Sequence, residues 1–474
     1  MVFQSLIFIQ FFLAVLTAYW LLRRREWQNG FLLAASLVFY GWVHAWWVIL
    51  ILLTCVVDFT AARLLTDRPH QRKRWLVLSL VTNFSILAVY KYFDFFSGSV
   101  AALGQRLGWE IHPFLLHVGL PAGISFYTFQ SASYVVDVYR KKMEVRRSLP
   151  EYVLFVSFFP HLVAGPIQRA HFLLSQIERP RVFDARVARG AVLLILWGFF
   201  KKLVIADNAA MVVAKVFSLD DPTFPVLWSG VFAFGVQIYA DFSAYTDIAR
   251  GISRLLGFEL CQNFDHPYSA DSPQDFWRRW HISLSNWFRD YVYIPLGGSR
   301  CSLAMQCRNL LLTFLLSGLW HGAAWNFVLW GAWHGVLLVL WTLWGKAPAA
   351  VRPERLPRFA RVILTFILVH IGWLLFREQS APHLLKHFSL NPFAADSVQW
   401  RIGWFFVVQT LFYAFPLYLH PLVDRFLARH PEAVAEHFPG WRWTLVLMLT
   451  AALLYAGLLL LRSPASSDFI YFQF

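Results

Sequence analysis

Two histidines stand in an unusually aromatic part of this chain, between Ser317 and Gly335. The segment reads SGLWHGAAWNFVLWGAWHG and holds four tryptophans and four glycines, but no aspartate, glutamate, lysine or arginine. A histidine inside an apolar span is costly to place, which makes it a functional-site candidate. Because a neutral imidazole is basic near physiological pH, His321 is a candidate for proton transfer. If the segment is one continuous helix, His334 lies about 20 Å further along it and cannot serve the same reacting atom as His321. We expect His334 to be structural or part of an exit path.

A second informative passage runs from Gln237 to Arg300 and contains three tryptophans at helical spacing, Trp277, Trp280 and Trp287. This spacing predicts an amphipathic helix at the membrane interface, with its tryptophans at headgroup level. On such a helix His281 and Ser285 would share one face. His281 also stands beside a tryptophan, as His321 does.

Together, the two histidines indicate a buried reaction chamber in which His321 and His281 are catalytic. The residues expected to support them are Trp320, Asn286, Ser285, Asp241 and Asp247. Although histidines and aspartates can bind a transition metal, these residues contain no H-x-x-x-H or C-x-x-C pair, and we predict no metal site. The sequence also lacks the G-x-S-x-G motif of a serine nucleophile.

The composition requires a membrane around these residues. Of 474 residues, 58% are hydrophobic and only 15% are charged, which is more apolar surface than a water-soluble fold can cover. The net charge of +15 is typical of basic loops on the cytoplasmic face and is scattered between the apolar runs. It forms no module that reads nucleic acid, so nucleic-acid binding is excluded.

The apolar runs predict an all-α polytopic protein, with about eleven transmembrane helices and two or three re-entrant elements in one continuous membrane domain, residues 1–474. Tyr152–Gly165 has basic loops on both sides, and it is expected to dip into the membrane and return. Leu310–Gly345 must also enter and leave on one side, which places His321 near its turn. The first run precedes Arg23–Arg25, so both termini are expected outside the cytoplasm.

Several motifs resemble those of the membrane-bound O-acyltransferase (MBOAT) family. They are Gly123–Gln130, Phe159–Arg169, Tyr239–Asp247, Asp275–Arg300 and Ser317–Gly322. The resemblance is strongest over residues 85–345, includes a catalytic segment at 237–335, and favours the bacterial branch that serves alginate O-acetylation. It implies helices around a central tunnel, with His321 as the active-site histidine and His281 as the second histidine or its polar partner.

The resemblance also implies a function in the bacterial inner membrane. An acetyl group, from cytoplasmic acetyl-CoA rather than from a tightly bound cofactor, would cross the membrane to a periplasmic O-acetyltransferase or acetylesterase-like partner that modifies an exopolysaccharide such as alginate or cellulose. The arginines expected to bind the phosphates of the donor are Arg278, Arg279, Arg289 and Arg300. The alternative is a transporter or flippase in which the histidines relay protons.

Overall fold

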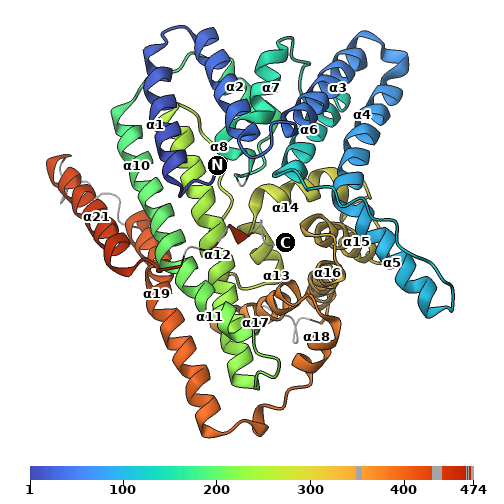
Figure 1. Cartoon of the computed structure of the whole chain (residues 1–474), viewed down its shortest axis with the longest axis vertical. Helices are drawn as coiled ribbons and strands as arrows, with labels where there is room; N and C mark the ends of the chain where they lie inside the picture. Colours follow the sequence, from blue (N-terminus) through green and yellow to red (C-terminus); the bar gives the residue numbers. More distant parts are fainter. Residues whose placement is uncertain (164, 349–354, 430–439, 466, 468, 471–474) are drawn as a thin grey trace. The chain divides into compact units, whose positions relative to one another are not determined.

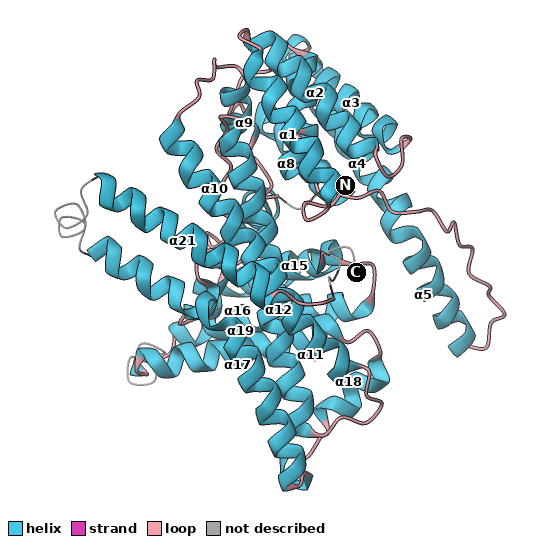
Figure 2. Ribbon diagram, turned by 60° about the vertical axis from the view of Figure 1, so that its left-hand side comes forward, coloured by secondary structure: helices cyan, strands magenta, loops and turns pink. Residues whose placement is uncertain are grey.

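The computed structural model describes residues 1–474 except 164, 349–354, 430–439, 466, 468 and 471–474 (Figure 1). All regular elements among the described residues are helices, joined by loops and turns (Figure 2). This confirms the predicted all-α class. The chain divides into two compact units, the first formed by Met1–Ala191 with Ala249–Cys261 and the second by Val192–Ile248 with Gln262–Phe474.

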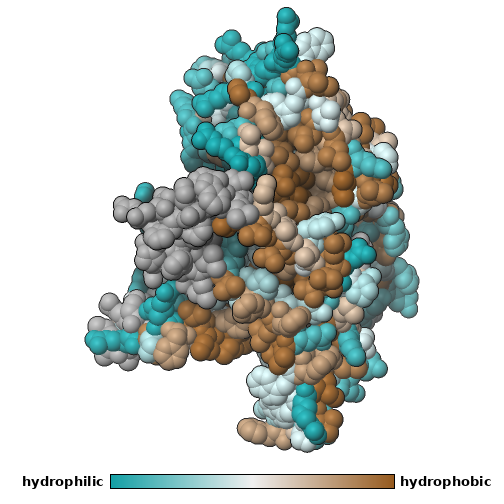
Figure 3. Space-filling model, turned by 90° about the vertical axis from the view of Figure 1, so that its left-hand side faces the viewer, coloured by the Kyte–Doolittle hydropathy of each residue, from teal (hydrophilic) through white to brown (hydrophobic). Residues whose placement is uncertain are grey.

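The long apolar helices confirm a multi-pass membrane protein. Five described segments are long and apolar enough to cross a bilayer: 47–67, 69–106, 325–345, 358–377 and 397–420. Two shorter apolar helices lie at 6–21 and 448–461. Large apolar side chains are exposed on many helices, and brown, hydrophobic residues cover much of the face in Figure 3. The total of about eleven spans and the orientation of the termini stay predictions.

The first unit is a set of helices whose polar side chains meet inside it. Its complete helices are α1 (Leu6–Leu21), α2 (Arg25–Gly41), α3 (Trp47–Asp67), α4 (Arg72–Leu87), α5 (Phe93–Arg106), α6 (Ile124–Tyr139), α7 (Leu149–Ser157), α8 (Phe159–Leu162) and α9 (Ala170–Ile177). Asp58 of α3 is fully buried and accepts hydrogen bonds from Ser79 at 2.6 Å, from Asn83 at 2.7 Å and from Ser131. These bonds join α3 to α4 and α6 where no water is available.

The segment predicted to dip into the membrane forms two short helices. Helix α7 has nine residues, begins at Leu149 and ends at Ser157, and α8 has only four. Neither reaches the roughly 20 residues that a spanning helix needs. Neither helix alone is therefore long enough to span the bilayer, and the predicted dip of this segment into the membrane stays a prediction.

The second unit holds both candidate histidines. It includes the end of α10 (Ala185–Phe200), most of α12 (Phe224–Leu255), and α11 (Asp207–Phe217), α13 (Pro273–Arg279), α14 (Ile282–Phe288), α15 (Leu303–His321), α16 (Trp325–Gly345), α17 (Arg358–Arg377), α18 (Ala381–Phe388), α19 (Ser397–Arg429) and α21 (Gly440–Leu461). A π-helical stretch, Lys201–Ala206, joins α10 to α11.

Helices α15 and α16 form a tight hairpin with His321 at its turn. Helix α15 ends at His321, and α16 begins at Trp325. The two helices cross where Gly318 and Gly331 lie backbone to backbone, because a Cβ atom on Gly318 would be 3.1 Å from the Cα of Gly331. Small residues permit this close approach of membrane helices. The predicted excursion of 310–345 is thereby confirmed as a helical hairpin.

Candidate active site

His321 lies in an aromatic cage at the end of α15. Its ring centroid is 5.0 Å from that of Trp320, 4.8 Å from that of Trp330 and 5.4 Å from that of Phe376. The cage therefore draws on three helices, α15, α16 and α17. Only 6% of His321 is exposed. Such a site keeps water away from the imidazole, which strengthens its electrostatic interactions with a bound substrate.

His281 lies at a break between two short helices, and the prediction of one continuous helix through it is wrong. Helix α13 ends at Arg279, α14 begins at Ile282, and His281 itself has φ 43° and ψ 53°. This left-handed conformation is uncommon for a residue other than glycine. Asn263 stabilises the break, because its carbonyl oxygen accepts from the Ile282 N–H at 2.9 Å and its Oδ1 from the Ser283 N–H at 3.1 Å.

The break brings the two histidines together. The imidazole centroids of His281 and His321 are 6.3 Å apart, and the Trp320 ring contacts both. Phe242 of α12 packs edge-on against His281 at 4.7 Å. His281 is fully buried and lies outside the candidate membrane spans; burial lowers its pKa to about 3. His281 is therefore neutral at physiological pH, because burial disfavours the charged imidazolium.

The tryptophans of this region are inside the protein and not at the membrane interface. Trp280 is 1% exposed, Trp277 8% and Trp287 5%. The expectation of an interfacial belt is wrong for these three residues. The indole N–H groups of Trp277 and Trp330 are buried and have no hydrogen-bond partner among the described residues. Each is therefore an unused donor beside the histidines, of the kind that a bound substrate can satisfy.

His334 does not follow His321 on one continuous helix, so that premise of the sequence argument is wrong. It lies on the second arm of the hairpin, and its ring centroid is 4.9 Å from Trp330 and 5.1 Å from Trp277. Trp330 contacts both His334 and His321. His334 thus packs behind the indole that forms one wall of the His321 cage.

A cavity of about 450 Å³ lies beside the histidines. The predicted site residues Ser285, Asn286, Arg278 and Arg289 line it, together with Ser317. Ser317 is four residues before His321 and on the same face of α15. The histidines themselves are not among the lining residues, so the cavity ends one helical turn from the His321 ring.

The other two predicted arginines do not line this cavity. Arg279 is ion-paired with Asp275 at 2.9 Å and lies 3.8 Å from Asp265. Arg300 is exposed in the loop before α15. The structure therefore separates the four arginines into a cavity pair, Arg278 and Arg289, and an outer pair, Arg279 and Arg300.

The predicted supporting aspartates are in ion pairs with two lysines. Asp241 Oδ1 is 3.0 Å from Lys202 Nζ, and Asp247 Oδ2 is 2.7 Å from Lys201 Nζ. Phe242, the residue after Asp241, contacts the His281 ring, so Asp241 is one residue away from a direct contact of His281. The sequence analysis missed both lysines, although two adjacent lysines directly after an apolar run are a signal, since buried charge is expensive and needs partners.

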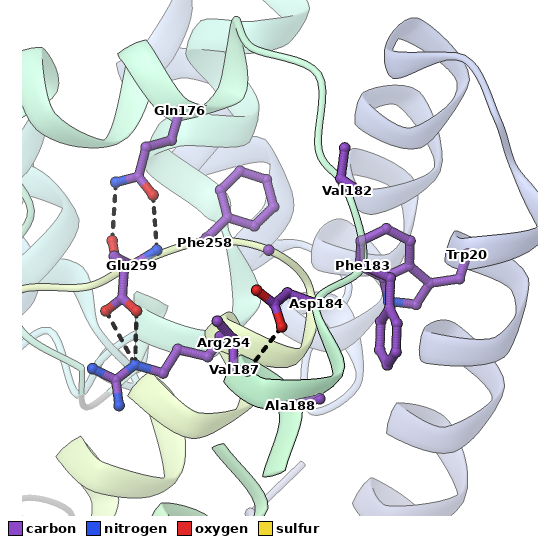
Figure 4. A pocket seen from close by; sticks show the side chains of 11 residues that line it. Trp20, Gln176, Val182, Phe183, Asp184, Val187, Ala188, Arg254, Phe258 and Glu259 are labelled. Carbon is purple, nitrogen blue, oxygen red and sulfur yellow. Dashed lines mark hydrogen bonds and ion pairs between the residues drawn. The ribbon is translucent and has the colours of Figure 1, made fainter. Parts of the chain in front are cut away.

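The described residues contain no group of three or more His, Cys, Asp or Glu side chains that could hold a metal ion. A second cavity, of about 230 Å³, lies in the first unit (Figure 4). Arg254 there donates through Nε to both carboxylate oxygens of Glu259, and Trp20 and Phe183 form the opposite wall. None of the predicted site residues lines this second cavity.

Comparisons with known proteins show what this chain is similar to. Residues 144–378 match the model of the MBOAT, membrane-bound O-acyltransferase family. A probable alginate O-acetylase of Azotobacter vinelandii is 40% identical over 80% of this chain and 76% of its own length. A protein of the same description from Pseudomonas putida is 37% identical over the whole of both chains. A peptidoglycan O-acetyltransferase of Helicobacter pylori is 31% identical over 94% of this chain and 91% of its own length.

Proposed function

The chain belongs to the membrane-bound O-acyltransferase family and is an acyltransferase, and we propose that it takes an acetyl group from cytoplasmic acetyl-CoA and passes it across the bacterial inner membrane for O-acetylation of an exopolysaccharide such as alginate or cellulose. The names of its relatives support acetylation of a polysaccharide. The observation that carries the proposal is the pair of buried imidazoles, His281 and His321, whose ring centroids are 6.3 Å apart.

The spacing of the two imidazoles suits one reacting centre between them. An acceptor hydroxyl there is within hydrogen-bond reach of His321, which takes its proton as the oxygen attacks the thioester carbonyl carbon. The carbon–sulfur bond breaks, and the leaving thiolate takes the proton back from the protonated His321 imidazole to become the free thiol, which restores neutral His321. His281, neutral and able to donate one N–H, polarises the carbonyl oxygen, helped by Ser285 and Asn286.

The cavity is the proposed route for the thioester arm of the donor. It combines apolar walls from Leu284, Phe314 and Leu338 with polar groups from Ser285 and Asn286. Arg278 and Arg289 at its edge are exposed, where they can pair with the phosphates of acetyl-CoA. The arm would extend from these arginines toward Ser317 and the histidine pair.

Replacing both cavity arginines with alanine is expected to raise the KM for acetyl-CoA about 10- to 100-fold with a small effect on kcat, because two exposed arginines together contribute about as much as one charge-assisted hydrogen bond, about 1.5–3 kcal/mol. The matched control is the double replacement of the outer pair, Arg279→Ala with Arg300→Ala. Steady-state kinetics in proteoliposomes measure both constants. An equal rise in KM for both doubles would contradict the assignment of the cavity.

The proposed topology places the basic loops in the cytoplasm and both termini in the periplasm. The final acceptor would be a periplasmic O-acetyltransferase or acetylesterase-like protein that modifies the polymer. The chain would then connect a donor on one side of the bilayer to an acceptor on the other.

The direct test is release of free thiol from acetyl-CoA by purified protein in proteoliposomes, with acetylated acceptor recovered in equal amount. We expect transfer that depends on the histidine pair. A transporter or flippase that relays protons through the histidines would move its substrate without breaking the thioester bond. Thiol release no faster than in empty liposomes, with the periplasmic partner present, would overturn the proposal.

A further inference from the structure

A buried ion cluster includes Asp241, the residue before Phe242, whose ring packs against His281. Lys202 is fully buried, and its Nζ is 2.9 Å from Asp207 Oδ1 and 3.0 Å from Asp241 Oδ1. One cation between two carboxylates leaves an excess of negative charge. Inside a protein this arrangement is stable only when further hydrogen-bond donors satisfy the remaining carboxylate oxygens.

A distant segment of the chain supplies those donors. The Ser467 hydroxyl donates to Asp207 Oδ1 at 2.6 Å, and the Ile470 N–H donates to Asp241 Oδ2 at 2.7 Å. The Ser467 carbonyl oxygen accepts from Lys202 Nζ at 2.8 Å. The segment is held again after α21, where the Ser463 N–H donates to the Leu203 carbonyl at 3.0 Å. Ser467 and Ile470 therefore bond to both carboxylates of the cluster and to its lysine.

The same segment inserts an aromatic ring into the wall of the site. Phe469 is fully buried, with its ring centroid 4.0 Å from that of Tyr245 and 6.0 Å from that of Phe242. Phe242 packs edge-on against His281 at 4.7 Å. An unbroken series of ring contacts thus leads from Phe469 through Phe242 to the imidazole.

We propose that Ser467, Phe469 and Ile470 form a positioning element of the active site: the Lys202–Asp207–Asp241 cluster binds Ser467 and Ile470, and Phe469 holds Phe242 against His281. Phe242 and Asp241 are adjacent on α12, so binding of these three residues fixes the position of the ion cluster and of the Phe242 ring together. This inference rests on the proposed function only in calling His281 an active-site residue. The contacts themselves concern the accessibility and orientation of the imidazole.

The test is the rate at which diethyl pyrocarbonate modifies His281 in membranes, followed by mass spectrometry of the full-length protein. This reagent attacks neutral imidazole, and His281 is neutral at the working pH of about 6.5 because its pKa is lowered to about 3. The rate therefore reports access and not protonation. We expect Phe469→Ala to raise it at least about tenfold, since a wall that loses its packing opens more often. Exposed His171 is the internal reference in each sample.

Three further variants separate positioning from general loss of stability. Phe469→Leu, which keeps an apolar side chain at this position, is expected to restore most of the protection of His281. Ser467→Ala is expected to weaken protection less than Phe469→Ala, because the Ile470 bond to Asp241 remains. Phe8→Ala removes an equally buried ring in the first unit and is expected to leave His281 protected even where it lowers the melting temperature.

Acetyl transfer is measured on the same variants as a second readout. A loss in kcat with Phe469→Ala that Phe469→Leu recovers, at constant KM for the donor, supports positioning. Unchanged protection of His281 in Phe469→Ala would overturn the inference. A third outcome separates the two proposals. If Phe469→Ala increases the modification of His281 but the wild type transfers no acetyl group, the positioning role is supported and the proposed function is contradicted.

Discussion

Replacing His321 with alanine is expected to leave the protein folded in the membrane and to reduce acetyl transfer about 10²- to 10⁴-fold, the range that a positioned general base contributes. The imidazole is enclosed by Trp320, Trp330 and Phe376, and each of these rings also packs against at least one ring other than His321. The loss should fall on kcat, because in the proposed mechanism His321 acts on the acceptor hydroxyl, and it does not line the cavity proposed for the donor. Thiol release and polymer acetylation measure it.

His334→Ala is the matched control for this prediction. His334 is equally buried, belongs to the same hairpin and also packs on Trp330, so its loss should disturb the aromatic cluster to a similar extent. It should nevertheless preserve most of the activity at equal protein levels. If His334→Ala and His321→Ala reduce transfer equally, the effect of His321 is structural and the assignment as a base is wrong.

His281→Ala extends the test to the pair. When two groups act on one reacting centre, removing the second after the first costs little, since their effects are not additive. The double variant of His281 and His321 is therefore expected to be no slower than the slower of the two single variants. A loss equal to the product of the single losses would show that the two imidazoles work in separate steps.

The sequence was enough to single out His321 as a candidate site residue, because the cost of placing it is visible in the sequence. A histidine in an apolar segment that lacks charged residues is expensive wherever the fold places it, and an apolar run too long for one span must turn back. Those two facts are enough to place His321 at the turn of the α15–α16 hairpin. His281 is marked differently, by the tryptophan beside it, Trp280, as His321 is by Trp320.

Other features depend on contacts that sequence spacing does not contain. The left-handed backbone of His281 occurs at a residue other than glycine and is fixed by Asn263, so helical periodicity could not reveal the break. The partners of Asp241 are Lys202, 39 positions earlier in the chain, and Ile470, 229 positions later. The choice between Arg278 and Arg279 likewise follows from Asp275 pairing with one of two adjacent arginines.

The close crossing of α15 and α16 determines where His321 lies, which leads to a second large effect. A Cβ atom on Gly318 would overlap the carbonyl oxygen of Phe327, and one on Gly331 would overlap that of Phe314. These are backbone atoms, so no side chain can rotate away. Gly318→Val is expected to force the helices apart and to reduce either the amount of folded protein or its acetyl transfer at least about tenfold, as overpacking of a dense interior costs 1–3 kcal/mol or more.

Smaller substitutions identify the cause. Gly318→Ala and Gly331→Ala should each cause part of the same loss, because both add a methyl group at one crossing point. Gly190→Ala is the control, since a Cβ atom there meets no atom within 4 Å and alanine is the better helix former by about 1 kcal/mol. Thermal unfolding and acetyl transfer, measured on the same preparations, distinguish a loss of folded protein from a loss of activity in protein that is still folded. Full activity in Gly318→Ala would mean that the hairpin can widen without moving His321 away from His281, and the placement of the base would then not depend on this crossing.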